Sequence, residues 1–139
     1  MKQIVDVPDL ADVRKFAYAQ CATAGDFVFV AGQAGIDKEL NVVSPEFGPQ
    51  ARQALANLRL ALQAAGADFR DVVTMTVYVA DIRHAHEFLE IRTELFGDDL
   101  APSALIGGAS FVLPGLLIEV QATAVRSNEA HLTVDTTVK

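Results

Sequence analysis

The fold is decided by one stretch, Leu113-Pro114-Gly115-Leu116-Leu117-Ile118-Glu119-Val120-Gln121-Ala122-Thr123-Ala124-Val125. A Pro-Gly turn opens it, and two sets of residues then alternate with the period of a β-strand. The even-numbered residues form a wholly apolar face. Glu119 is the only charged residue and lies on the other face. Its carboxylate is either solvated on an open sheet face or held in a pocket, where lost hydration raises its pKa and suits it to proton transfer.

Composition predicts one domain with a substantial core. The chain has 139 residues, of which 51% are hydrophobic and 21% are charged. A chain of this length buries a core without a disulfide or a metal. The apolar fraction is high for a small monomer, so we expect part of the apolar surface to lie between subunits.

Charge and cysteine content limit the partners. The formal net charge is −7, and the eleven Lys and Arg residues are scattered, which argues against a nucleic-acid partner. Cys21 is the only cysteine, so no internal disulfide forms and we expect a reducing, cytoplasmic setting. The start of the chain resembles no signal peptide, and no run approaches the roughly 18 apolar residues of a membrane span. We therefore expect a soluble protein that is not exported.

The first part of the chain predicts strands. Residues 1–15 predict a short edge strand and a loop, and residues 16–33 predict a hairpin. Its second strand begins Phe-Val-Phe-Val and is apolar on both faces, so we expect a central strand covered on both sides. Gly32 interrupts this strand, which indicates a bulge or a close approach to the backbone. Residues 35–43 predict a second small hairpin.

Two helices are predicted. Ser44 as N-cap and Pro45 at the first helical position begin a helix that runs to about Ala65. Its buried stripe consists of Ala51, Leu55, Leu58, Leu62 and Ala65. Asp81 is expected to cap a second helix that runs to about Phe96. The apolar arc of the second helix consists of Ala85, Phe88, Leu89, Leu95 and Phe96, with Arg92 near its centre. Arg92 either extends past its apolar neighbours into water or binds an anion at a subunit boundary.

The remaining elements complete an α+β pattern. Residues 71–79 predict a strand with Val73, Met75, Val77 and Val79 on one face, and residues 101–112 predict a strand with a glycine pair. The order is β-β-β-α-β-α-β-β, which indicates a mixed sheet with two helices on one face. The polar tail, residues 127–139, is expected to be loosely held.

Common catalytic and metal-binding motifs are absent from the sequence. His84 and His86 are two residues apart on a predicted helix, so they point to different faces and are poor co-ligands for a metal. Cys21 lies beside a predicted strand turn and is expected to pack as a small hydrophobe instead of acting as a nucleophile.

Six blocks of the sequence resemble the signature blocks of the Rid family, which is also called YjgF/RidA-like or L-PSP. They are Tyr18-Ala19-Gln20, Phe29-Val30-Ala31-Gly32-Gln33, Gln50-Ala51-Arg52-Gln53-Ala54-Leu55-Ala56-Asn57-Leu58, Ala64-Ala65-Gly66-Ala67, Asp71-Val72-Val73 and Ile118-Glu119-Val120. The resemblance runs in order from about residue 16 to residue 126. Each block is short, but together they are specific for the superfamily.

The resemblance implies a chorismate-mutase-like α+β fold in a single domain, residues 1–126, that assembles as a homotrimer with three clefts between subunits. In the best-understood branch these clefts hydrolyse reactive enamines and imines without a metal or cofactor. By this resemblance Glu119 matches the glutamate that activates the hydrolytic water. Tyr18 matches the tyrosine that lines the pocket, and Gly32 matches the strand glycine that lets the ligand approach the backbone.

The chain also departs from the deaminase branch. That branch has Pro-Ala-Arg-Ser where this chain has Ala101-Pro102-Ser103-Ala104. Ser103, or Ala104 if the register slips, replaces the arginine that binds the substrate carboxylate, and Leu89 replaces an asparagine of the second helix. A serine cannot form the two-pronged ion pair of a guanidinium. We therefore expect poor hydrolysis of 2-iminopropionate, unless Arg92 compensates.

Two functions remain open. The first is a cofactor-free trimeric enzyme that hydrolyses or tautomerises an enamine, an imine or a related unsaturated small molecule. Glu119 would be its general acid/base, and its substrate-binding residues would be Tyr18, Gly32, Ser103, Arg92 and Leu89. The second is a non-catalytic trimer that binds a metabolite or a partner in the same clefts. The ribonuclease or translation-inhibitor role attached to some relatives fits poorly with the acidic charge.

Overall fold

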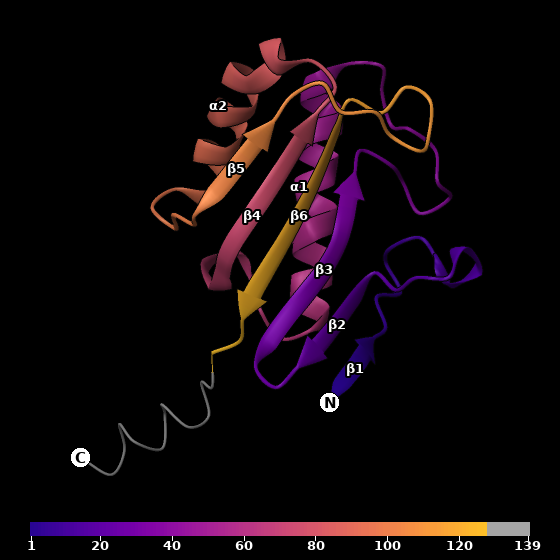
Figure 1. The fold of residues 1–139 in the computed structure, drawn as a ribbon, viewed down its shortest axis with the longest axis vertical. Coiled ribbons are helices and arrows are strands. Elements are labelled where there is room, and N and C mark those ends of the chain that lie inside the picture. Colours follow the sequence, from indigo (N-terminus) through magenta and orange to yellow (C-terminus); the bar gives the residue numbers. More distant parts are fainter. Residues whose placement is uncertain (128–139) are drawn as a thin grey trace.

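A computed structural model describes residues 1–127 as a six-stranded mixed sheet with two helices packed on one face (Figure 1). The strands are β1 (Lys2–Val5), β2 (Cys21–Ala24), β3 (Phe27–Ala34), β4 (Val72–Val79), β5 (Ser103–Ile106) and β6 (Ile118–Val125). The helices are α1 (Phe47–Ala64) and α2 (Ala85–Phe96), and three single-turn 3₁₀ helices lie at Arg14–Phe16, Phe69–Asp71 and Ile82–His84. The predicted element order and α+β class are confirmed. The predicted polar tail lies, from residue 128 onward, outside the described residues.

Strand β6, which comes from the stretch that decides the fold, lies in the middle of the sheet. The strand order is β1-β2-β3-β6-β4-β5, so β6 is paired on both sides. All neighbouring strands are antiparallel except β4 and β5, which are parallel. In this register Glu119 lies between Ala34 of β3 and Tyr78 of β4. The Pro-Gly turn therefore leads the chain directly into the centre of the fold.

The core lies between the sheet and α1. Figure 1 shows α1 running behind the middle strands, and α1 packs on β3 and β6. The even-numbered residues of β6 are buried, as the alternation predicts. Every residue of the predicted α1 stripe is also buried, namely Ala51, Leu55, Leu58, Leu62 and Ala65. The alternation of apolar residues in β6 and their helical spacing in α1 thus correctly predicted which residues form the core.

The other face of the sheet carries no helix within residues 1–127, and we call it the open face. Its side chains come from alternate residues of strands β3, β4, β5 and β6. They are Phe27, Phe29, Ala34, Thr76, Tyr78, Ala104, Ile106, Glu119, Gln121 and Thr123. Strand β3 lies inside the sheet as predicted, but the described chain covers only one of its faces. Val28 and Val30 are buried, whereas Phe27 and Phe29 are about half exposed.

One predicted boundary near the N-terminus was wrong. The first strand of the hairpin begins at Cys21, not at residue 16, because a 3₁₀ turn at residues 14–16 ends at Ala17 in a left-handed conformation (φ 66°). The small hairpin predicted for residues 35–43 is present in minimal form, with one antiparallel bridge, Ile36 to Val42, and backbone hydrogen bonds on either side of it. The Asp37 carboxylate accepts hydrogen bonds from the backbone N–H groups of Glu39 and Asn41 and closes the turn of this hairpin.

Both helices differ in detail from their predictions. Helix α1 begins at Phe47, because the Ser44 hydroxyl accepts a hydrogen bond from the Glu46 N–H and holds a turn before the helix. Asp81 caps a 3₁₀ turn that precedes α2. The buried stripe of α2 consists of Phe88, Ile91 and Phe96, while Leu89 and Leu95 are exposed. The predicted arc was therefore displaced around the helix.

Two strand predictions also need correction. A register shift between Val72 and Thr74 turns Val73 toward solvent and places Val72 in the core. The strand predicted for residues 101–112 ends at Ile106, and the chain then forms a loop with Gly108 at φ 73°. No helix within residues 1–127 is long and apolar enough to cross a membrane.

Candidate functional site

A cavity of about 410 Å³ lies beside the end of β3 and the start of β6. Three segments far apart in the chain build it: the N-terminal segment, the end of β3 with the loop that follows, and the loop before β6. The lining residues are Phe16, Tyr18, Gln20, Gly32, Gln33, Ala34, Ile36, Leu40, Phe111, Val112, Leu113, Leu116 and Glu119. We call it the Glu119 cavity. It brings together three of the sequence-predicted site residues: Glu119, Tyr18 and Gly32.

Glu119 is a partly buried carboxylate in a mostly apolar wall. Burial raises the pKa of its carboxyl group above the ordinary value. No hydrogen bond or ion pair within residues 1–127 engages this carboxylate, so nothing there compensates for its lost hydration. Of the two interpretations of Glu119 in the sequence, the pocket fits the structure better than the solvated face.

Gly32 lies in the irregular part of β3, between Val30 and Gln33, where the register with β6 shifts. A Cβ atom at Gly32 would lie 2.7 Å from Cδ of Glu119 and would also collide with its Oε1. Glycine is therefore required for the carboxylate to lie against the backbone of β3. The structure has both features that a glycine within a strand indicates, a bulge and a close approach.

Tyr18 reaches the same cavity from the N-terminal segment. Burial raises the pKa of its hydroxyl group, and the negative charge of Glu119 raises it further. Tyr18 therefore carries a neutral O–H donor close to the carboxylate. Ala17, directly before Tyr18, is in the left-handed conformation and ends the 3₁₀ helix at residues 14–16.

Gln20 and Gln33 are the two glutamines that line the cavity, and their side chains are hydrogen-bonded to each other. The Gln33 side-chain N–H group donates to Oε1 of Gln20 at 2.8 Å and to the Ala31 carbonyl at 3.1 Å. Gln20 in turn donates to the Ala11 carbonyl at 3.0 Å. These bonds fix the N-terminal segment to β3. Three of the four amide hydrogens of these two side chains are used inside the protein.

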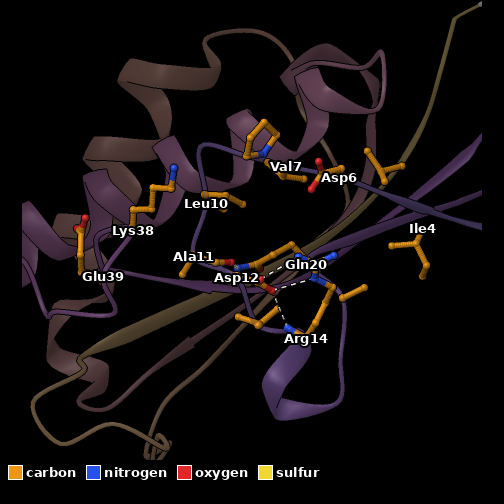
Figure 2. Close-up of a pocket in the computed structure, with 14 residues that line it drawn as sticks. Ile4, Asp6, Val7, Leu10, Ala11, Asp12, Arg14, Gln20, Lys38 and Glu39 are labelled. Carbon is orange, nitrogen blue, oxygen red and sulfur yellow. Dashed lines mark hydrogen bonds and ion pairs between the residues drawn. The ribbon is translucent and has the colours of Figure 1, made fainter.

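Gln20 also lines a second, larger cavity of about 650 Å³ along the N-terminal segment (Figure 2). Figure 2 shows the Arg14 guanidinium directed at Asp12, and Nη2 lies 2.9 Å from the Asp12 carboxylate. The hydrogen bonds from Arg14 lower the pKa of Asp12 to about 2. Arg14 is therefore paired with its own neighbour and leaves no free positive charge for a ligand of the Glu119 cavity.

The other three predicted site residues lie elsewhere. Leu89, Arg92 and Ser103 line a separate cavity of about 180 Å³ between α2 and β5. Nη1 of Arg92 donates to Oγ of Ser103 at 2.9 Å, and the guanidinium lies 5.2 Å from the centre of the Phe88 ring. Burial lowers the pKa of Arg92. Within one chain these residues do not share a cavity with Glu119.

The pairing of β4 with β5 decides between Ser103 and Ala104. Ser103 pairs with Met75, which is buried under the helices, so Ser103 points toward α2. Ala104 pairs with Thr76, and its side chain lies on the open face, as that of Glu119 does. The sequence left both residues open as the position of the missing arginine. Ala104 is the one that shares a sheet face with Glu119.

The remaining reactive side chains lie apart from the Glu119 cavity. The His84 ring stacks on Phe47 with centroids 4.4 Å apart, and its buried Nδ1 has no hydrogen-bond partner. His86 is exposed and lies 3.1 Å from Glu90. Cys21 is buried, and burial raises the pKa of its thiol to about 11. No group of three His, Cys, Asp or Glu side chains within residues 1–127 could hold a metal ion.

The apolar wall of the cavity was not predicted. Phe16 was assigned to a strand, Phe111 and Val112 were assigned to the end of another, and Leu113 was assigned to the Pro-Gly turn that follows. The structure puts Phe16 at the end of a 3₁₀ helix and the other three residues in the loop before β6, where their large apolar side chains line the cavity. One signal was present in the sequence: three consecutive large apolar residues directly before the Pro-Gly turn, where a polar loop is usual.

Comparisons with known proteins agree with this fold. The family model described as Endoribonuclease L-PSP matches residues 12–126. A RutC family protein of Pyrococcus horikoshii is 36% identical over 78% of this chain and 86% of its own length. A 2-iminobutanoate/2-iminopropanoate deaminase of Rattus norvegicus is 38% identical over 79% of this chain and 80% of its own length. The crystal structure of a YjgF/YER057c/UK114 family member from Mycobacterium tuberculosis superposes with a TM-score of 0.76 at 28% identity, covering 90% of this chain and 99% of the other. The chain therefore belongs to the L-PSP family, which is also called the Rid or YjgF family.

Proposed function

We propose that this protein is a small-molecule enzyme that hydrolyses or tautomerises an imine or enamine in the Glu119 cavity without a cofactor. The observation that carries the proposal is the Glu119 carboxylate itself. It is partly buried in an apolar wall, has a raised pKa and has no partner within residues 1–127. Perturbed carboxyl groups in clefts are common features of sites that transfer protons.

The chemistry needs one group that both donates and accepts a proton. Glu119 in its protonated form gives a proton to the imine nitrogen, and its carboxylate then takes a proton from the attacking water. The carbinolamine that forms loses ammonia and leaves a carbonyl compound, so one imine and one water yield one carbonyl and one ammonia. The raised pKa of Glu119 supports this dual role, since both protonation states are then accessible closer to neutral pH. Tyr18 supplies a neutral donor to orient the water or the substrate.

We propose further that the enzyme is a homotrimer and that each cavity is completed at a subunit boundary. The open face carries exposed aromatic and aliphatic side chains, including Phe27, Phe29 and Ile106, over the full width of the sheet. Exposed apolar patches of this kind mark interaction sites. The trimeric state itself is what the family resemblance implies.

A relative supports the reaction class. The rat protein is named for the deamination of 2-iminobutanoate and 2-iminopropanoate and is 38% identical over 79% of this chain. The identity of the substrate is a separate question, because residues at the edge of a shared site can change while the catalytic group stays.

The test is the isosteric change Glu119→Gln. An amide of the same shape neither donates to the imine nor accepts from water, so turnover should fall by about 10²–10⁴ while the assembly stays intact. Glu90→Gln, which changes an exposed carboxylate on α2, is the matched control and should keep full activity. Ligand binding without turnover in the unmodified protein would favour the alternative, a non-catalytic trimer that binds a metabolite or a partner in the same clefts.

A further inference from the structure

Among the described residues that line the cavity, Glu119 is the only charged side chain. No Lys, Arg or His is among them. Lys15 is the nearest exposed cation along the chain, and its ammonium lies over the Phe16 ring at 5.3 Å without lining the cavity. Arg14 is paired with Asp12. Among the described residues of one chain, a ligand that carries a carboxylate would therefore meet a negative charge and no positive one.

The uncharged polar side chains of the cavity have too few free hydrogen-bond donors to bind a carboxylate in place of a cation. A carboxylate is usually held by two or more aligned donors. Gln33 uses both amide hydrogens on Gln20 and Ala31, and Gln20 uses one on Ala11. The Tyr18 hydroxyl and one remaining Gln20 hydrogen are the side-chain donors left among the lining residues. They are enough to orient one water molecule or one nitrogen.

The rest of the wall is apolar and large. Its aliphatic and aromatic side chains come from Phe16, Ala34, Ile36, Leu40, Phe111, Val112, Leu113 and Leu116. The volume of about 410 Å³ lies within the usual range of small-molecule sites, roughly 300–1,000 Å³. A two- or three-carbon substrate would leave most of this wall in contact with water. An aryl or branched alkyl substituent would cover it and gain from the burial.

We propose that the substrate of the Glu119 cavity is an imine without a carboxylate that carries a bulky apolar substituent, such as an aryl ketimine. This inference rests on the proposed function and names its substrate class. A neutral imine becomes a cation when its nitrogen is protonated, and the Glu119 carboxylate then stabilises the iminium that water attacks. The bond that forms is carbon–oxygen. The bond that breaks is carbon–nitrogen, and ammonia leaves.

The test compares two imines that differ in one group. Acetophenone imine carries a methyl group where 2-imino-2-phenylacetate carries a carboxylate. The first is added from an anhydrous stock, and the second is generated in place by an amino-acid oxidase acting on phenylglycine. Both yield aryl ketones whose appearance is followed by absorbance. The full chain in its native assembly is used, so any group from a neighbouring subunit is present.

The expected result is a kcat/KM for acetophenone imine at least about 100-fold above that for the carboxylated imine. The Glu119 carboxylate and a substrate carboxylate would lie about 5 Å apart. At an effective dielectric constant of about 20, the repulsion between two unit charges at this distance lowers kcat/KM by a factor of this order. Equal rates, or faster hydrolysis of the carboxylated imine, would overturn the inference and leave the proposed function standing. Acceleration of neither imine would overturn the proposed function as well.

A charge placed on the rim supplies a second, independent test. Val112 lines the cavity but is 99% exposed, so it tolerates a long polar side chain. Val112→Arg should shift the ratio of the two kcat/KM values toward the carboxylated imine by at least about tenfold, because it adds the missing cation. Val112→Gln, which adds bulk without charge, should not shift that ratio. An unshifted ratio in Val112→Arg would show that charge does not govern selectivity at this site.

Discussion

The close approach of Gly32 to Glu119 offers a test of the site that leaves the carboxylate in place. In Gly32→Ala the new Cβ would lie 2.7 Å from Cδ of Glu119, whereas ordinary contacts begin at 3.4 Å. The difference, 3.4 − 2.7 = 0.7 Å, is the least distance by which the carboxyl carbon must move. The collision with Oε1 is more severe. We therefore expect the carboxylate to be displaced by about 1 Å, a misplacement that costs roughly 100-fold in rate.

Stability should change little in the same variant. Gly32 does not lie in the left-handed region, so alanine can adopt its backbone conformation. Replacing glycine reduces the entropy of the unfolded chain and stabilises by about 0.4–1 kcal/mol. An off-rotamer Glu119 side chain costs about 0.5–1.5 kcal/mol. The two effects nearly cancel, so the melting temperature, followed by circular dichroism, should shift by only a few degrees.

The kinetic assay is hydrolysis of acetophenone imine by Gly32→Ala, Glu119→Gln and the double variant. If Gly32 acts only by giving Glu119 its position, the double variant should be no slower than Glu119→Gln alone. Displacing the carboxylate toward water should also bring its pKa closer to the ordinary value, and the pH–rate profile should shift to lower pH. Wild-type activity in Gly32→Ala, or fully additive losses in the double variant, would refute the reasoning.

Three further predictions concern stability and assembly. The raised pKa of Glu119 means that the folded state holds this proton more tightly than the unfolded chain, so its contribution to stability falls as the pH rises from the ordinary carboxyl pKa through the folded one. In urea titrations Glu119→Gln should therefore equal the wild type below about pH 4 and be the more stable protein near neutral pH. Phe29→Lys should dissociate the proposed trimer, and light scattering should then give the mass of one chain. An undiminished mass would place the interface elsewhere. Gln50→Ala removes three hydrogen bonds from a fully buried side chain and should lower the free energy of unfolding by about 3–5 kcal/mol, with a loss near zero contradicting the role of this amide.

The fold was predictable because its signals are local. Strand β6 alternates at period two, and α1 repeats at helical spacing, so each pattern fixes which face of its own element is buried. The errors arose where a few residues changed the geometry without changing the pattern. The bulge at Val72–Thr74 turned Val73 outward, and a hydrogen bond from the Glu46 N–H to the Ser44 hydroxyl delayed the start of α1. Neither the bulge nor the hydrogen bond can be predicted from the spacing of apolar residues.

The site was only partly predictable. Glu119 stood out because a charge in the middle of an apolar strand is costly unless something accommodates it. The wall around it could not be derived, because Phe16 and Phe111 are far apart in the chain and meet only through the tertiary fold. The sequence also grouped Arg92 and Ser103 with Glu119. Strand register separates them, since Ser103 points under α2 while Glu119 lies on the open face.

Gln50 connects helix α1, which the sequence predicts well, to the loop before β6, which it predicts poorly. It lies in α1 and is fully buried. Its amide donates to the Ser44 and Gly115 carbonyls and accepts from the Leu117 N–H, all at 2.8–2.9 Å. One side chain therefore holds both the turn before α1 and the turn before β6. The loop that carries Leu113 and Leu116 into the cavity wall is thus anchored to the rigid core, so the apolar wall keeps a fixed distance from Glu119.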